Sequence, residues 1–241
     1  METEGTAVDV ISCHLKSKLL SFPGGRFNPK DEGERAQFAV YALNRRAAEA
    51  AAVRAYATRL LAGDGQHRAV VVAGDLNDEP EAATTQLLHG PPGSEIGTGA
   101  FDHPDSGDGQ RLWNLAPLIP EDQRFSRVYR GRGELIDHLL VSHVLVKAVR
   151  TVTTGEIELP SITDQPGERE DGAGSDHRPV VGCLQPRVVL QPTPGADVAT
   201  SQQPTLPVYP FGEPGREIVI HQGDIERLSA SEEELARSRQ P

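Results

Sequence analysis

Three short polar segments carry the residues best suited to chemistry in this chain. They are Gly74-Asp75-Leu76-Asn77-Asp78, Ile136-Asp137-His138 and Ser175-Asp176-His177, and each follows or interrupts an apolar run. Each segment brings a carboxylate together with an amide or an imidazole, at an expected strand or its end. A rigid sheet can hold such groups around a divalent cation and a phosphate. The three segments therefore predict metal-dependent hydrolysis of a phosphoester.

The first segment follows the apolar run 69–73, which we expect to form a buried strand. Asp75 and Asn77 lie two positions apart, so their side chains can point to the same side at the carboxyl end of that strand. Taken alone, the segment fits an Asx-rich turn before a helix that Pro80 begins equally well.

The second segment places Asp137 inside the apolar stretch 135–141. A buried charge is costly unless it is paired or liganded, so a functional role and a structural salt bridge are both open for Asp137. His138 points to the opposite face by the strand period of two. We therefore assign His138 to packing and leave it out of the site.

The third segment lies between a Gly-rich loop and a strand expected at 179–184. Alternation sends the side chains of Asp176 and His177 in different directions, so one can bind metal while the other faces the phosphate. A capping Asp beside a surface His is the alternative.

A fourth candidate group lies at the end of a strand expected at 6–13. There, His14 can protonate a leaving alkoxide and Lys16 can neutralise phosphate, with an exposed basic loop as the alternative.

Strands and helices are both needed to position these residues. Further strands are expected at 125–130, 134–142 and 144–153, the first two joined by a turn at 131–133, and helices at 31–62 and 80–88, with a polar loop from 93 to 110. The segment 31–62 begins with acidic residues and ends at Gly63, as dipole and capping preferences predict for one long helix or two joined ones. Its expected buried stripe consists of Phe38, Tyr41, Ala42, Val53, Tyr56, Ala57 and Leu60.

Composition limits the classes of partner. The 241 residues carry a formal net charge of −11, which argues against a general duplex-DNA binder and favours a cation between protein and phosphate. Cys13 and Cys183 are expected to be buried reduced thiols. No apolar run is long enough for a membrane helix, and the chain is interpreted as soluble and cytoplasmic. Residues 1–185 are expected to form the domain, and 186–241 a Pro-rich linker with an acidic tail, in which 224–239 can fold as a helix on a partner.

In their order along the chain, four motifs together resemble the endonuclease/exonuclease/phosphatase superfamily. They are His-Leu-Lys-Ser from His14, Gly-Asp-Leu-Asn-Asp from Gly74, Gly-Arg-Gly-Glu-Leu-Ile-Asp-His from Gly131, and Ser-Asp-His-Arg-Pro-Val from Ser175. The superfamily includes deoxyribonuclease-I-like nucleases, abasic-site endonucleases, inositol polyphosphate phosphatases and sphingomyelinases. The resemblance covers residues 6–185 and implies an α/β fold, a four-layer α/β/β/α sandwich with the site between two sheets.

The resemblance also implies roles for single residues. Asp75 is similar to the residue that orients or deprotonates the attacking water, and Asn77 to the one that holds the scissile phosphate. Asp176 resembles a metal ligand, and we expect Asp75 to take part in binding the ion. Mg²⁺ suits an oxygen-rich site with few protein ligands, and Mn²⁺ often substitutes for it.

The remaining roles concern three residues. His177 resembles the imidazole that contacts the phosphate and stabilises the pentacovalent transition state. Asp137 is similar to the carboxylate that orients this imidazole. His14 resembles the histidine that assists departure of the leaving group in some branches.

The family pattern starts earlier than this chain does, with one strand bearing an Asn and another bearing a metal-binding Glu. Only 13 residues precede His14, and Glu2 and Glu4 lack flanking strands. We therefore expect the chain to be the C-terminal portion of the domain, missing an N-terminal half. It is either a hydrolase whose activity needs that half, or a non-catalytic remnant that binds a partner or a phosphorylated ligand. Nuclease and phosphatase activity both stay open, with a small phosphoester or phosphodiester favoured over duplex DNA.

Overall fold

The computed structural model describes residues 7–156, 158–163, 175–184, 206–208 and 218–220. It divides into two compact units, Met1–Ser21 with Phe27–Leu190, and Phe22–Arg26 with Gln191–Pro241. All candidate site residues belong to the first unit. Glu2, Glu4 and the helix expected at 224–239 lie outside the described residues.

The second unit contains two short strands that the sequence did not predict. β9 (Leu206–Val208) and β10 (Ile218–Ile220) pair antiparallel, with Pro207 opposite Val219. A proline inside a short apolar run argues against a central strand, so local pattern alone predicts irregular structure here.

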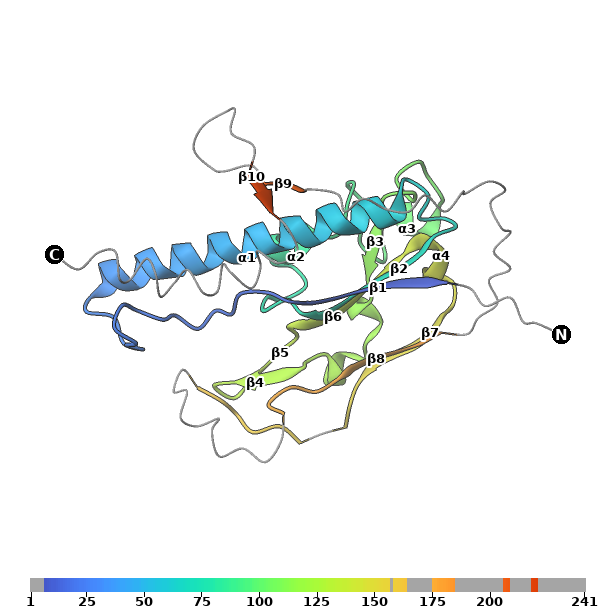
Figure 1. The fold of residues 1–241 in the computed structure, drawn as a ribbon. Coiled ribbons are helices and arrows are strands. Elements are labelled where there is room, and N and C mark those ends of the chain that lie inside the picture. The colour runs from blue at the N-terminus through green and yellow to red at the C-terminus, as the bar shows by residue number, and fades with distance from the viewer. Residues whose placement is uncertain (1–6, 157, 164–174, 185–205, 209–217, 221–241) are drawn as a thin grey trace. The chain divides into compact units, whose positions relative to one another are not determined.

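The first unit is built on a mixed sheet whose strands come from distant parts of the sequence (Figure 1). Its order is β1 (Val8–His14), β2 (Ala69–Asp75), β6 (Asp137–Ser142) and β3 (Leu112–Asn114). β1 and β2 are parallel, and β6 is antiparallel to both of its neighbours. The strands expected at 6–13 and 69–73 are confirmed, and β3 is new.

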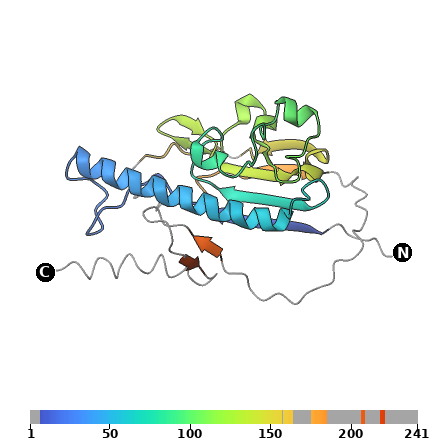
Figure 2. The same cartoon turned by 90° about the horizontal axis from the view of Figure 1, so that it is seen from above.

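One long helix, α1 (Glu32–Leu61), lies along this sheet (Figures 1 and 2). Asp31 caps it by accepting a hydrogen bond from the Glu34 backbone N–H at 2.8 Å, and the helix ends where Ala62 adopts a left-handed conformation. The prediction of a helix over 31–62 is confirmed as a single element.

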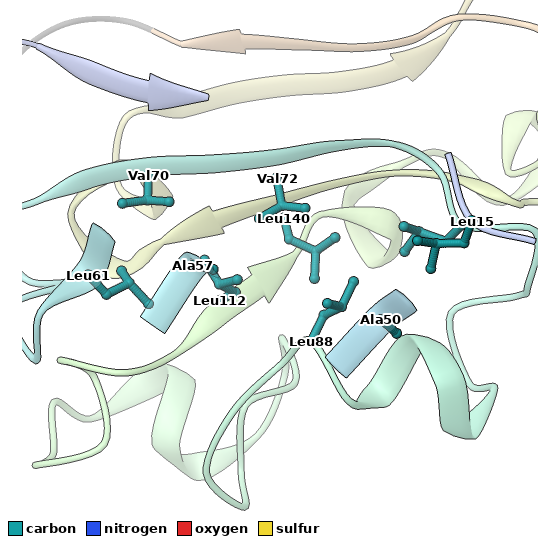
Figure 3. Close-up of a cluster of buried hydrophobic side chains, with 10 residues drawn as sticks. Leu15, Ala50, Ala57, Leu61, Val70, Val72, Leu88, Leu112 and Leu140 are labelled. Atoms are coloured by element: carbon teal, nitrogen blue, oxygen red, sulfur yellow. The ribbon is translucent and has the colours of Figure 1, made fainter. Parts of the chain in front are cut away.

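The buried face of α1 confirms part of the predicted stripe, because Ala42 and Ala57 are buried and Val53 and Leu60 pack against the core. The small side chains Ala50 and Ala57, with Leu61, pack against residues of β2, β3 and β6, as Figure 3 shows. Tyr41 and Tyr56 are 53% and 46% exposed, so their assignment to the core was wrong. Alanine lets the helix approach the sheet closely.

The second half of the unit differs most from expectation. The strand expected over 134–142 is two strands in different sheets, because β5 (Arg132–Glu134) pairs with β4 (Arg127–Tyr129) while β6 enters the central sheet. The strand expected at 144–153 begins as a helix, α4 (His143–Val146), and only then becomes β7 (Val149–Thr154). β7 pairs with β8 (Val180–Leu184), which confirms the last predicted strand.

Short helices complete the unit. α2 (Ala83–Gln86) is shorter than the helix expected at 80–88, and α3 (Gly99–Asp102) lies in the segment expected to be a loop. Two 3₁₀ turns, Ala116–Leu118 and Glu121–Gln123, precede β4. Among the described residues, no helix has both the length and the apolarity that crossing a bilayer requires.

The two cysteines are free thiols, as expected. Cys13 is partly buried against β2, and burial, with a contribution from the charge of Asp75, raises the pKa of its thiol to about 11. Cys183 is exposed, so the expectation of two buried thiols holds for neither cysteine in full.

Candidate active site

Three candidate residues form one row across the central sheet. The pairing register places His14 of β1 opposite Asp75 of β2, and Asp75 opposite Asp137 of β6. Because β1 and β2 end where the antiparallel β6 begins, polar residues from three strands meet at one edge. His14 Nε2 lies 3.3 Å from Asp75 Oδ2.

His177 joins this row from the segment before β8. Its Nδ1 lies 2.7 Å from Asp137 Oδ2. An ionised carboxylate only accepts hydrogen bonds, so Nδ1 carries the hydrogen and donates it. This arrangement fixes the ring tautomer and leaves Nε2 as the atom that can meet a substrate.

Ser126 binds the backbone of Asp137 and of Arg178, the residue after His177, although no pattern in the sequence points to it. Its buried hydroxyl oxygen accepts hydrogen bonds from the backbone N–H groups of Ile136 and Asp137, both at 3.1 Å. Its backbone carbonyl accepts one from Arg178 N at 2.7 Å. One residue thus connects the start of β6 to the segment that carries His177.

Asn77 orients Asp75 through two contacts. Its backbone N–H donates to Asp75 Oδ1 at 2.8 Å, and its amide Nδ2 donates to Asp75 Oδ2 at 3.1 Å and to the Leu15 carbonyl at 2.9 Å. Asn77 has a φ of +54°, a left-handed conformation that asparagine tolerates better than most residues. Gly74, directly before Asp75, cannot be replaced, because a Cβ there would lie 1.8 Å from the Cys13 carbonyl oxygen.

The site is electrostatically unbalanced toward negative charge. Burial raises the pKa of Asp75, and the neighbouring charge of Asp137 adds to the rise, against the hydrogen bond from Asn77 and the charges of His177 and His14. The hydrogen bond to Asp137 raises the pKa of His177 and outweighs the opposing effect of burial. Two carboxylates held this close favour any bound cation.

The donor set fits a divalent metal. One ligand atom each from Asp75, Asp137 and His177 lies within 4.8 Å of the others. Carboxylate oxygens are the ligands that Mg²⁺ and Mn²⁺ take in proteins. Because His177 Nδ1 is already hydrogen-bonded to Asp137, the carboxylates are the better ligands in this arrangement.

Two predicted residues lie apart from that cluster. Asp176 is half-buried beside His177, and its charge contributes to the raised pKa of the imidazole, but it is not among the three clustered residues. The Lys16 ammonium donates to the Leu19 carbonyl at 3.4 Å, and the Lys16 backbone N–H donates to Glu49 at 2.6 Å. The structure thus brings together His14, Asp75, Asn77, Asp137 and His177.

A charged network that the sequence did not reveal lies next to the site. Asp78 Oδ2 accepts from Arg46 Nε at 3.0 Å and from Thr84 at 2.6 Å, while Oδ1 lies 2.9 Å from Lys18 Nζ. His138 Nε2 lies 2.9 Å from the Asp78 backbone oxygen. Burial lowers the pKa of His138, so this ring stays neutral inside the protein, in line with its assignment to packing.

A comparison with known protein families finds a match over most of the chain. A model of the Endonuclease/Exonuclease/phosphatase family matches residues 10–177, more than two thirds of the chain. The chain belongs to this family. A comparison with curated proteins returns no match.

Membership in the endonuclease/exonuclease/phosphatase family places the chain among hydrolases that typically depend on a divalent metal. The matched range runs from β1 to His177, so it contains the whole row of site residues. A mixed α/β unit with sheets agrees with the fold of this family.

Proposed function

We propose that the chain is a divalent-metal-dependent phosphoester hydrolase in which an activated water attacks phosphorus in line with the leaving group. The observation that carries this proposal is the convergence of Asp75, Asp137 and His177, with the His177 ring held by a 2.7 Å hydrogen bond to Asp137. Partly buried carboxylates beside an imidazole are groups that can support such an attack.

Asp75 is the proposed acceptor for the proton of the attacking water. Its two oxygens are oriented by Asn77, which leaves lone pairs on each for a water or a cation. A raised pKa makes a carboxylate a stronger base, which suits the removal of a proton from water. Asn77 would then hold the scissile phosphate next to that water.

His177 is the proposed donor to the phosphate oxygens. With Nδ1 bound to Asp137, its Nε2 can donate a hydrogen bond to an oxygen on which negative charge develops. The raised pKa of the ring favours the protonated form that does this. His14, whose side chain is 75% exposed, is placed to give a proton to the leaving alkoxide.

Asp75 and Asp176 are the proposed ligands of Mg²⁺ or Mn²⁺, with Asp137 close enough to contribute a further oxygen. A bound ion supplies positive charge against the phosphate and lowers the pKa of a coordinated water. The residues around it hold the substrate and move the protons. We also propose that residues 1–185 belong to a four-layer α/β/β/α sandwich, and that 186–241 form a linker and tail.

Hydrolysis of bis-p-nitrophenyl phosphate and p-nitrophenyl phosphate tests the proposal. We expect turnover with Mg²⁺ or Mn²⁺, none with EDTA, and a loss of about 10³-fold in Asp75→Ala. Asp64→Ala is the matched control, because Asp64 lies in the loop before β2, where it pairs with His67. The ratio of diester to monoester turnover then separates nuclease from phosphatase chemistry.

Two outcomes contradict the proposal. Turnover that survives both EDTA and Asp75→Ala would show that this row is not the active site. A folded chain that binds phosphoesters without hydrolysing them would favour the alternative, a non-catalytic protein that recognises a phosphorylated ligand.

A further inference from the structure

The β4–β5 hairpin and the residues just before it carry an excess of positive charge in this acidic chain. Residues 124–134, which form the β4–β5 hairpin and its approach, contain four arginines (Arg124, Arg127, Arg130 and Arg132) and one acid (Glu134). The segment is therefore net positive in a chain of formal charge −11. Such a local asymmetry marks a surface for anions.

The arginines of the hairpin are arranged around an aromatic ring. The guanidinium carbons of Arg127 and Arg130 lie 5.5 and 5.4 Å from the ring centre of Tyr129, and Arg132 is directly opposite Tyr129 in the strand register. Arg127 is buried and pairs with Glu134 across the hairpin at 2.5 Å, so the exposed arginines of β4, β5 and their turn are Arg130 and Arg132. Guanidinium groups beside aromatic rings offer both phosphate donors and flat surfaces on which unpaired bases stack. The hairpin therefore has the composition of a surface for single strands.

The tip of the hairpin is strained by one of these arginines. Arg130 and Gly131 form a two-residue turn with φ values of +49° and +77°. Such turns prefer Asn, Asp or Gly at both positions, and a long side chain is disfavoured there. Arg130 is exposed, so the turn places a cation at the tip of the hairpin.

This hairpin borders the proposed active site. Ser126, at the base of β4, binds the backbone of Asp137. Arg132 Nη2 lies 3.8 Å from Oε1 of Glu79, which follows Asn77 by two residues. Arg178 directly follows His177, and its guanidinium stacks 4.2 Å from the ring centre of Phe125, just before β4. A nucleic acid strand with one phosphate at His177 would thus have arginines next to its neighbouring phosphates.

We propose that the β4–β5 hairpin, together with Arg178, binds the phosphate backbone and bases of a single-stranded nucleic acid whose scissile phosphate lies at the Asp75 row. This inference rests on the proposed function, and it names the substrate class. A single strand suits the surface better than a duplex, because duplex binding depends on many phosphate contacts and the rest of the chain is acidic. Stacking on rings also requires bases that are not paired.

Binding of a fluorescent single-stranded oligonucleotide of mixed sequence to the full chain tests this inference. The titration is followed by anisotropy in EDTA, where hydrolysis does not proceed. Arg130→Asn removes the charge and leaves a residue that the turn prefers, so folding is retained. We expect affinity to fall about threefold to tenfold in Arg130→Asn and further in Arg130→Asn with Arg132→Gln. The slope of log affinity against log salt should also become shallower by about one for each phosphate that the variant no longer neutralises.

Arg59→Gln is the matched control for these variants. Arg59 lies on α1 and also sits over an aromatic ring, 5.0 Å from the centre of Tyr56, but away from the hairpin. Its replacement should leave the affinity and the salt slope unchanged. Thermal unfolding of each variant verifies that the fold is kept.

Three results would overturn the inference. They are equal affinity in wild type and the double variant, binding of duplex as tight as binding of single strand, and hairpin-dependent binding of inositol hexakisphosphate without binding of the oligonucleotide.

Failure of the proposed function gives a different result. Hairpin-dependent binding without hydrolysis in Mg²⁺ would refute hydrolysis alone, whereas oligonucleotide hydrolysis with a KM that the arginine variants do not change would refute the inference alone.

Discussion

Asp75, the last residue of β2, and Asp78, three residues later in the loop that follows, have opposite surroundings. Asp75 faces a second carboxylate, Asp137, and its pKa is raised. Burial alone would raise the pKa of Asp78 too, but hydrogen bonds from Thr84 and Lys18 and the charges of Lys18 and Arg46 outweigh it and lower the pKa. The same side chain is thus destabilised as an anion in one position and stabilised in the other.

This difference separates the residues that we assign to function from those that stabilise the fold. The network of Asp78 is neutralised by the protein's own cations and connects α1 to the loop after β2. The row of Asp75 and Asp137 has a carboxylate pair that the nearby imidazoles balance only in part. Negative charge that the protein does not neutralise opposes folding. We therefore expect such charge at a position where a bound cation neutralises it.

The largest effect on stability is expected from removing Asp78, whose charge the protein neutralises. Asp78→Ala should lower the free energy of unfolding by about 3 kcal/mol, because it leaves the buried Arg46 without its carboxylate. Urea denaturation of the purified variants measures this. Asp75→Asn should not lower the stability at pH 7, since the raised pKa means that the folded state disfavours the ionised carboxylate. A larger loss in Asp75→Asn than in Asp78→Ala would refute the comparison.

The pH dependence of stability has opposite signs at the two positions. The lowered pKa of Asp78 contributes stability above the unfolded value of about 3.9, and this contribution disappears as the pH falls through the folded pKa. The unfolding free energies of wild type and Asp78→Ala should therefore converge in acid. Ionised Asp75 opposes folding above its raised pKa, so the advantage of Asp75→Asn should shrink as the pH falls through the folded pKa and should be gone below the unfolded value.

A smaller effect is expected at the pair that links the row to the loop before β8. Asp137→Asn should lower kcat about 10²-fold, because His177 loses the negatively charged acceptor that fixes its ring and stabilises its protonated form. It should also lower the pKa of His177, since the hydrogen bond to Asp137 is the main cause of its rise. The alkaline limb of the kcat profile should thus move to lower pH. An NMR titration of the His177 ring in metal-free protein measures the shift directly, and an unchanged ring pKa would contradict the role of Asp137.

The parts of the site that the sequence predicted are those set by local pattern. β1, α1 and β2 follow from alternation, caps and apolar runs within each segment, so His14, Asp75 and Asn77 were found at the correct ends of their strands. Asp137 was found because a charge inside an apolar stretch needs a partner. Their assembly into a row depends on strand pairing between distant segments, which no local pattern encodes.

The residues that the sequence missed are those defined only by tertiary contacts. Arg46 lies on the buried face of α1, four positions from Ala42 and Ala50, and that spacing was the one available signal for it. Ser126 offered no such signal, because its hydroxyl acts on a strand ten residues later. The break between β5 and β6 was missed because the apolar run continues across it while the chain passes from one sheet to another.

The smallest effect is expected at His14, and it should depend on the leaving group. A donor to the leaving oxygen matters when that oxygen would otherwise depart as a basic alkoxide, so His14→Gln should slow an alkyl phosphodiester about tenfold and leave bis-p-nitrophenyl phosphate almost unchanged. The exposed side chain of His14 permits water to replace part of its function, which keeps the effect small. Lys16→Gln is the control, since the Lys16 ammonium contacts a backbone carbonyl and should show no such selectivity. Equal slowing of both substrates by His14→Gln would instead show that His14 positions Asp75, whose Oδ2 lies 3.3 Å from His14 Nε2. Asp75 would then be held in place from β1 as well as by Asn77.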